Sequence, residues 1–131
     1  MIERYADIIR FWDIDEIIPV PIHKKRLRQR GFNQSEIIAQ EIGSIMNIPV
    51  SKDKIIRIKN TKPQKALDDM ERIKNIRNAF CAVRGYKPHK NILIIDDIYT
   101  TGATIRHIAQ ILKELGAVRV FFLTISIGQG I

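Results

Sequence analysis

The segment Asn91–Thr104 constrains the fold of this chain more than any other stretch of the sequence. It begins with the apolar run Ile92–Ile95, whose length and branched side chains are typical of a β-strand buried on both faces. Asp96 and Asp97 follow, and because unpaired carboxylates cannot enter a dry sheet, we expect the strand to stop there. A hydroxyl-rich turn then leads into an amphipathic pattern that predicts a helix, with Gly116 as its C′ residue.

The turn and the acidic pair each have a chemical use. The turn lies at a predicted helix N-terminus, where backbone N–H groups and the positive end of the helix dipole attract phosphate. Gly102 allows close backbone approach, and further donors come from the hydroxyls of Thr100, Thr101 and Thr104. The carboxylates of Asp96 and Asp97 can accept hydrogen bonds from vicinal sugar hydroxyls or bind Mg²⁺. Together these groups describe a site for a phosphorylated ribose.

A purely structural role for the same residues is the alternative. Thr104 would then only cap the helix, and Asp96 and Asp97 would end the strand in solvent. Capping alone does not require two acids before three threonines and a glycine, so the segment as a whole favours a binding site. For Thr104 taken alone, both roles stay open.

Length and composition predict a single domain covering residues 1–131. The chain has 131 residues and 45% hydrophobic content, which is enough to bury a core. No apolar run reaches the roughly 18 residues that a membrane span needs, and the first residues do not resemble a signal peptide. Cys81 is the only cysteine, which permits neither an internal disulfide nor a cysteine-based zinc site, so we expect a cytoplasmic protein.

Strand-like and helix-like segments alternate along the chain. The patterns predict strands over 16–20, 54–58, 78–83, 92–95 and 118–127. They predict helices over 2–11, from a cap at Asn33 or Ser35 to about 47, and after 104, with a helical turn near 67–73 and a turn or sheet edge at 48–50. This alternation indicates a three-layer α/β/α domain with a mainly parallel sheet.

Two of these helices carry predicted apolar faces. In the first helix, the stripe that should join the core or form a contact in a homodimer comprises Tyr5, Ile8, Ile9 and Trp12. In the second, the side chains expected to face inward are Ile37, Ile38, Ile42, Ile45 and Met46. Gly43 lies among them, where it allows close packing at a small cost in helix stability.

Positive charge is concentrated in two segments of a chain whose formal net charge is +8 and whose pI is about 9.9. The first segment contains Lys24, Lys25, Arg26, Arg28 and Arg30, and the second contains Lys54, Arg57, Lys59, Lys62 and Lys65. Runs like these are most often solvated faces. In a parallel sheet, however, the ligand crevice lies outside the carboxyl ends of the strands, so loops 21–32 and 60–66 should converge on the loop after Ile95.

The nonapeptide Asp96–Thr104 resembles the signature of type I phosphoribosyltransferases, which bind 5-phosphoribosyl-1-pyrophosphate (PRPP). Three further segments, Pro19–His23, Arg30–Gln34 and Lys59–Gln64, are similar to those of the ComF family of competence-associated phosphoribosyltransferase-like proteins. The resemblance covers residues from about 17 to 128. It implies a type I phosphoribosyltransferase-like fold.

Two features depart from the family pattern. Ala103 stands where a second glycine often sits, although ComF-like members tolerate alanine there. ComF-like chains usually carry an N-terminal cysteine-rich segment that binds zinc, and this sequence, with its single cysteine, lacks it.

The resemblance implies displacement of pyrophosphate from the anomeric carbon of PRPP by a nitrogen nucleophile, with Mg²⁺ as the cofactor. Cationic groups and the metal would stabilise the negative charge that develops on the leaving group. Asp96 and Asp97 would hold the ribose hydroxyls and the metal ion. The 5′-phosphate would be bound by Thr100, Thr101, Gly102, Ala103 and Thr104.

The same resemblance assigns residues to the pyrophosphate. The matching pyrophosphate loop comprises Pro21, Ile22, His23 and Lys24. Lys62 lies on a segment that corresponds to a loop closing over related sites, so it would reach the pyrophosphate when that loop is closed. Arg30 would either do the same or pack beside Gly31 and Phe32.

Three functions stay open at this point. A working transferase needs a hood segment to recognise the acceptor base, and only residues 1–16 and the tail after Ile125 are spare. A protein of DNA uptake or processing would use its basic loops to follow a nucleic-acid backbone or would bind a competence-machinery protein, although no aromatic residues interleave with the lysines. A regulatory homologue would bind PRPP without turnover.

Overall fold

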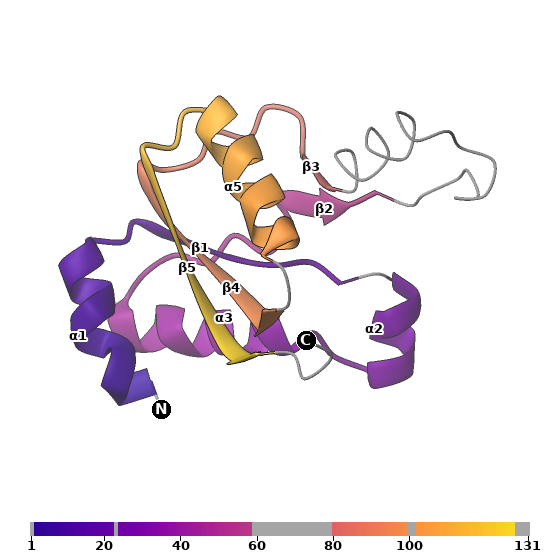
Figure 1. The fold of residues 1–131 in the computed structure, drawn as a ribbon, viewed down its shortest axis with the longest axis horizontal. Helices are drawn as coiled ribbons and strands as arrows, with labels where there is room; N and C mark the ends of the chain where they lie inside the picture. Colours follow the sequence, from indigo (N-terminus) through magenta and orange to yellow (C-terminus); the bar gives the residue numbers. More distant parts are fainter. Residues whose placement is uncertain (1, 23, 59–79, 100–101, 128–131) are drawn as a thin grey trace.

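The computed structural model of the protein describes residues 2–22, 24–58, 80–99 and 102–127. Its helices and strands (Figure 1) are α1 (Ile2–Trp12), β1 (Glu16–Pro19), α2 (Lys24–Arg30), α3 (Gln34–Met46), β2 (Ile55–Arg57), β3 (Phe80–Ala82), β4 (Asn91–Tyr99), α5 (Ala103–Glu114) and β5 (Arg119–Ile127). The turn expected near residues 67–73 and the lysine-rich loop 60–66 lie outside the described residues. None of the described helices combines the length and the apolar character needed to cross a membrane.

Three parallel strands form the main sheet, in the order β1-β4-β5. At its amino edge Glu16 pairs with Ile92, and the three strands run in one direction, so their carboxyl ends meet at the opposite edge (Figure 1). Beside β1, Val50 forms a parallel bridge with Ile17. This bridge confirms the sheet edge expected at residues 48–50, and the parallel pairing confirms the predicted α/β class.

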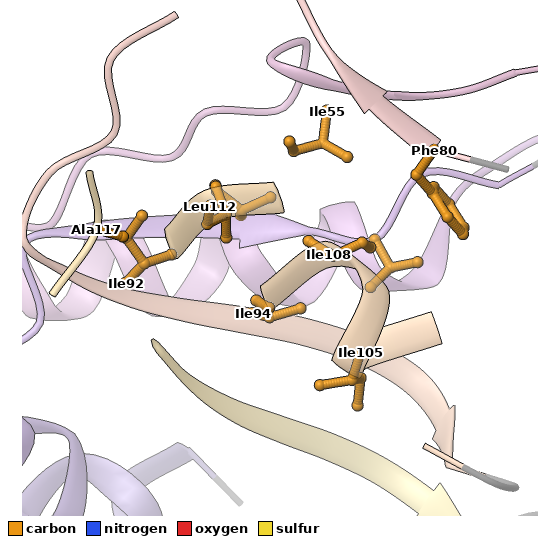
Figure 2. Packing of buried hydrophobic residues seen from close by; sticks show 10 residues of the cluster. Ile55, Phe80, Ile92, Ile94, Ile105, Ile108, Leu112 and Ala117 are labelled. Carbon is orange, nitrogen blue, oxygen red and sulfur yellow. The ribbon is translucent and has the colours of Figure 1, made fainter. Parts of the chain in front are cut away.

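The strand predicted to be buried on both faces lies at the centre of this sheet. Helix α5 covers one face, and α1 and α3 cover the other (Figure 1). Ile92 and Ile94 of β4 point toward α5 (Figure 2), whereas Leu93 and Ile95 pack on the side of α1 and α3. All four side chains have 0% exposure, because each face of β4 is covered by a helix. Ile92 and Ile94 form one hydrophobic cluster, the α5 cluster, with three buried side chains of α5, those of Ile105, Ile108 and Leu112.

Strands β2 and β3 do not belong to the parallel sheet. They pair with each other in antiparallel register, with Ile56 opposite Cys81, so the expectation that residues 54–58 contribute a strand to a common sheet is wrong. Ile55 is buried while Ile56 is exposed, and a strand buried on one face only suits an antiparallel pair better than the middle of a parallel sheet. Ile55 of β2 and Phe80 of β3 belong to the same hydrophobic cluster as the buried side chains of α5 (Figure 2).

The basic segment after β1 is a helix rather than the loop that the sequence predicted. Residues Lys24–Arg30 form α2, although Leu27 is the only apolar residue in it. Without a recurring apolar position there is no amphipathic signal to detect. Lysine, arginine, leucine and glutamine are all good helix formers, however, and this local preference accounts for the helix.

Helix α3 begins as predicted, and part of its predicted apolar face packs inward. The side chain of Asn33 caps it by accepting a hydrogen bond from the backbone N–H of Ser35 at 3.0 Å, as one of the two predicted caps requires. Ile42 is buried as expected, and Ile38 and Met46 pack against the same core. Ile37 and Ile45 are 50% and 56% exposed, so their predicted inward orientation is wrong. The buried positions carry mostly small side chains, those of Ser35, Ala39, Ile42 and Gly43, because α3 approaches the sheet edge closely.

That close approach makes Gly43 a stability test. A Cβ atom added at Gly43 would lie 2.6 Å from Cγ2 of Val50 and 2.7 Å from the backbone oxygen of Ile48. Since the second neighbour is backbone, it cannot turn away as a flexible side chain would. We therefore expect Gly43→Ala to lower the free energy of unfolding by about 1–3 kcal/mol in urea titrations, despite the better helix propensity of alanine.

The matched control for this prediction is Ser44→Ala, an exposed position in the same helix. It changes helix propensity without adding a buried atom, so we expect a difference within about 0.5 kcal/mol of wild type. A Gly43→Ala chain as stable as the Ser44→Ala chain would show that α3 does not approach residues 48–50 this closely.

A buried carboxylate fixes the amino edge of the sheet. Glu16, the first residue of β1, is 1% exposed and accepts hydrogen bonds from the hydroxyls of Ser51 and Tyr86 and from the backbone N–H of His89. Burial raises its pKa, but these donors, led by the His89 N–H, outweigh burial and hold the pKa below its ordinary value. Sequence patterns did not predict this cluster.

Candidate functional site

The acidic pair lies inside the last part of β4, not beyond its end. Strand β4 continues from the buried run through Asp96 and Asp97 to Tyr99, with Asp96 opposite Thr124 of β5. The prediction that the strand stops at the carboxylates is therefore wrong. Both aspartates are half-buried rather than enclosed, which removes the physical objection to carboxylates in a sheet.

The pleat of β4 directs the two carboxylates to different faces. Successive side chains of a strand alternate, and Ile94 belongs to the α5 side while Ile95 belongs to the side of α1 and α3. Asp96 therefore continues the row that faces α5, and Asp97 continues the row that faces α3. The two acids therefore face opposite sides of the sheet near its carboxyl edge.

An ion pair joins the basic segment to the acidic pair. Nη1 of Arg30, the last residue of α2, lies 3.2 Å from Oδ2 of Asp97, although 67 residues separate them in the sequence. The Arg30 side chain is 38% exposed and that of Asp97 is 20% exposed. The structure thus brings the first cationic segment to the carboxyl edge of β4, where the sequence predicted convergence. The second cationic loop, residues 60–66 with Lys62, lies outside the described residues.

The N-terminus of α5 lies directly after the acidic strand. Gly102 is its N-cap residue, with φ 77° and ψ 1°, a left-handed conformation that favours glycine. No described side chain caps α5, and its first turn contains no acidic residue. Thr104 is the second residue of the helix, so the alternative in which Thr104 caps α5 is wrong. A helix N-terminus that begins at a glycine and has no acid in its first turn is suited to binding an anion.

The remaining predicted site residues are placed only in part. Pro21 and Ile22 are half-buried between β1 and α2, and Lys24 is the first residue of α2. His23, Thr100 and Thr101 lie outside the described residues, whereas Ala103 is an exposed residue in the first turn of α5. The described part of the segment predicted to bind phosphate is therefore Gly102–Thr104.

Two hydrogen bonds hold the ends of the segment that connects β1 to α3 at this edge. The backbone N–H of Val20 donates to the carbonyl oxygen of Ile95 at 2.9 Å, which extends the pairing of β1 with β4. The side-chain amide of Asn33 donates to the carbonyl oxygen of Val20 at 3.1 Å while its oxygen caps α3. The segment that contains α2 therefore starts and ends beside β1.

The donor set at this edge fits Mg²⁺ brought by a phosphorylated ligand. Among the described residues there is no group of three or more His, Cys, Asp or Glu side chains that could hold a metal ion. Mg²⁺ commonly keeps several waters and is held through one or two carboxylates together with substrate phosphates. Asp96 and Asp97 supply carboxylate oxygens of this kind, and a transition-metal site would need softer or more numerous ligands.

Comparison with solved structures defines the class of protein. A purine phosphoribosyltransferase from Pyrococcus horikoshii superposes with a TM-score of 0.60 at 18% identity, covering 96% of this chain and 69% of that one. The chain therefore has a type I phosphoribosyltransferase fold with a parallel sheet.

Curated relatives narrow the class, although no family model matches the chain. Competence protein F of Haemophilus influenzae is 33% identical over 104 residues, which is 78% of this chain and 45% of the relative. DNA utilization protein YhgH of Escherichia coli strain K12 is 34% identical over 109 residues, which is 81% of this chain and 46% of the relative. The chain belongs to the ComF family, and it spans a little under half the length of these two relatives.

Proposed function

We propose that the chain binds PRPP together with Mg²⁺ at the carboxyl edge of β4. The observation that carries this proposal is the set of groups there: the aspartates of β4, the left-handed Gly102, the N-terminus of α5 and a guanidinium paired with Asp97. A helix N-terminus favours a phosphate, and carboxylates, one of them paired with a guanidinium, favour a diol and the Mg²⁺ that accompanies a diphosphate. PRPP contains a phosphate, a diol and a diphosphate in one molecule.

Residues of this chain would have separate roles in that complex. The first turn of α5, with Gly102, Ala103 and Thr104, would bind the 5′-phosphate through backbone N–H groups and the Thr104 hydroxyl. Thr100 and Thr101 are expected to bind the same phosphate. Asp96 and Asp97 would hold the ribose hydroxyls and Mg²⁺, which when bound neutralises charge on the diphosphate. The diphosphate would lie toward the loop after β1, where Pro21–Lys24 precede the body of α2 and where Lys62 is expected to reach.

Transfer of the phosphoribosyl group to a nitrogen nucleophile, with release of pyrophosphate, is the activity that we propose for this site. Support comes from the fold, which is shared with a purine phosphoribosyltransferase. We also propose that the protein acts in the cytoplasm, in keeping with a sequence that contains a single cysteine.

Isothermal calorimetry with PRPP tests this function. We expect binding with one site per chain in the presence of Mg²⁺, and affinity at least about tenfold lower in excess EDTA, because the diphosphate then keeps its full charge. Pyrophosphate release in the presence of purine and pyrimidine bases separates an enzyme from a protein that only binds. Absence of PRPP binding with Mg²⁺ present would contradict the proposal.

Binding of nucleic acid is a second candidate, favoured by the concentration of lysine and arginine in α2 and by relatives named for competence and DNA utilization. Phosphate contacts of this kind release counterions, so affinity for DNA should fall by orders of magnitude between about 50 and 200 mM salt. PRPP binding that persists at about 200 mM salt, where DNA binding is lost, would favour the first function. The reverse result would favour the second.

A further inference from the structure

The ion pair between Arg30 and Asp97 is too exposed to contribute much to the stability of the fold. Pairs at this exposure, 38% and 20%, contribute about 0–1 kcal/mol to folding. Its backbone setting is nevertheless well defined. The N–H of Gly31, which has a φ of 81°, donates to the carbonyl oxygen of Leu27 at 2.7 Å and closes α2 directly after Arg30. Two residues later Asn33 is bound to Val20 of β1. The backbone next to Arg30 is therefore held in place by these hydrogen bonds.

The partner of this guanidinium is also specific. Arg28 and Arg30 both lie in the last turn of α2 and are both exposed, but only Arg30 forms an ion pair with an acid among the described residues. Asp97 belongs to the face of β4 that runs toward α3, on the same side as α2. A guanidinium presents its donors in a rigid plane, so it fixes the direction of a carboxylate better than a lysine ammonium does.

Charge gives this contact a use in ligand binding. A ligand with a phosphate and a diphosphate carries several negative charges, and two adjacent carboxylates repel it. Arg30 offsets the charge of one of these carboxylates before any ligand arrives, and it also holds that carboxylate in one direction. Both effects lower the cost of bringing an anionic sugar to Asp97.

We propose that Arg30 is a positioning residue that orients and partly neutralises Asp97 for the ribose and its metal ion, rather than a residue that holds the pyrophosphate. This inference rests on the proposed function. It assigns to Arg30 a role different from both roles expected from the sequence, namely contact with the pyrophosphate or packing beside Gly31 and Phe32. The two roles differ in one measurable way: a positioning residue acts through Asp97, and a leaving-group ligand does not.

A double-mutant cycle separates these roles. PRPP affinity with Mg²⁺ is measured by calorimetry for wild type, Arg30→Gln, Asp97→Asn and the double variant, with Arg28→Gln as the matched control for loss of a charge from α2. We expect Arg30→Gln to weaken binding about tenfold or more and Arg28→Gln less than about threefold. In the Asp97→Asn background, Arg30→Gln should change affinity less than about twofold, because its effect needs the carboxylate.

Two outcomes of this cycle would overturn the inference. If Arg30→Gln weakened binding no more than Arg28→Gln does, only general electrostatics would be left to explain the effect. If Arg30→Gln had the same effect in the wild-type background as in the Asp97→Asn background, Arg30 would be a direct ligand contact.

A measurement without ligand keeps this test separate from the proposed function. The side-chain carboxyl carbon signal of Asp97 in NMR spectra should shift in Arg30→Gln and not in Arg28→Gln. An unshifted signal in Arg30→Gln would also overturn the inference, whether or not wild type binds PRPP.

Discussion

A chain carrying both Asp96→Asn and Asp97→Asn is expected to bind PRPP at least about 100-fold more weakly than wild type in the presence of Mg²⁺. Hydrogen bonds to charged groups contribute about 1.5–3 kcal/mol each, and two lost carboxylates therefore remove about 3 kcal/mol or more. Asparagine keeps the size of each side chain and the strand pairing of β4, so the fold should be retained. Calorimetry at a fixed Mg²⁺ concentration measures the change directly.

The single variants refine this prediction. Because Asp96 and Asp97 lie on opposite sides of β4, each should lower affinity by about tenfold on its own, and neither should substitute for the other. Asp53→Asn is the control, since Asp53 is exposed and lies near Ser51, whose hydroxyl contacts Glu16 at the amino edge. If the double variant bound PRPP as tightly as the Asp53→Asn variant, the acids of β4 would not belong to the site.

The second large effect is expected at that amino edge, in stability rather than in binding. Glu16→Ala should lower the free energy of unfolding by about 3–5 kcal/mol, because it leaves the hydroxyls of Ser51 and Tyr86 and the N–H of His89 without their acceptor. Glu16→Gln keeps an acceptor oxygen and the side-chain volume, so we expect a smaller loss of about 1–2 kcal/mol. Chemical denaturation at neutral pH measures both.

The pH dependence of stability follows from the same contacts. The folded-state pKa of Glu16 lies below its unfolded value of 4.5, so its contribution is fully present above about pH 4.5 and is lost as the pH falls through the lower folded value. The difference in unfolding free energy between wild type and Glu16→Gln should therefore shrink on acidification below about pH 4.5. Burial, followed by the neighbouring Glu16 carboxylate, raises the pKa of Tyr86, so its hydroxyl remains a donor throughout this range. A difference that stays constant down to about pH 2 would contradict this account.

Local patterns were sufficient for the buried run of the central strand and for the helix that follows it. The branched run Ile92–Ile95 requires cover on both faces wherever it lies, and the structure buries all four residues completely. Gly116 follows the end of α5 with a φ of 117°, as a C′ glycine should. In these cases a few adjacent residues determine the structure.

Pairing between distant segments was not contained in those patterns. Strand β2 pairs with β3 rather than with a strand of the main sheet, and nothing within residues 54–58 specifies that partner. The inward face of α3 depends on how closely Gly43 approaches residues 48–50, which decides that Ala39 is buried and Ile45 is not. Sequence patterns similarly located the cationic segment, but only the fold shows that Arg30 is the residue of the pair with Asp97.

The central claim, that one site at the carboxyl edge of β4 takes PRPP, is tested most directly by NMR titration of ¹⁵N-labelled protein with PRPP and Mg²⁺. We expect the backbone amide signals of Asp96, Asp97 and Gly102–Thr104 to change together and to saturate, while those of Ser51, Tyr86 and His89 at the amino edge stay unchanged. Signals that change at the amino edge, or none that change at saturating PRPP, would contradict the account.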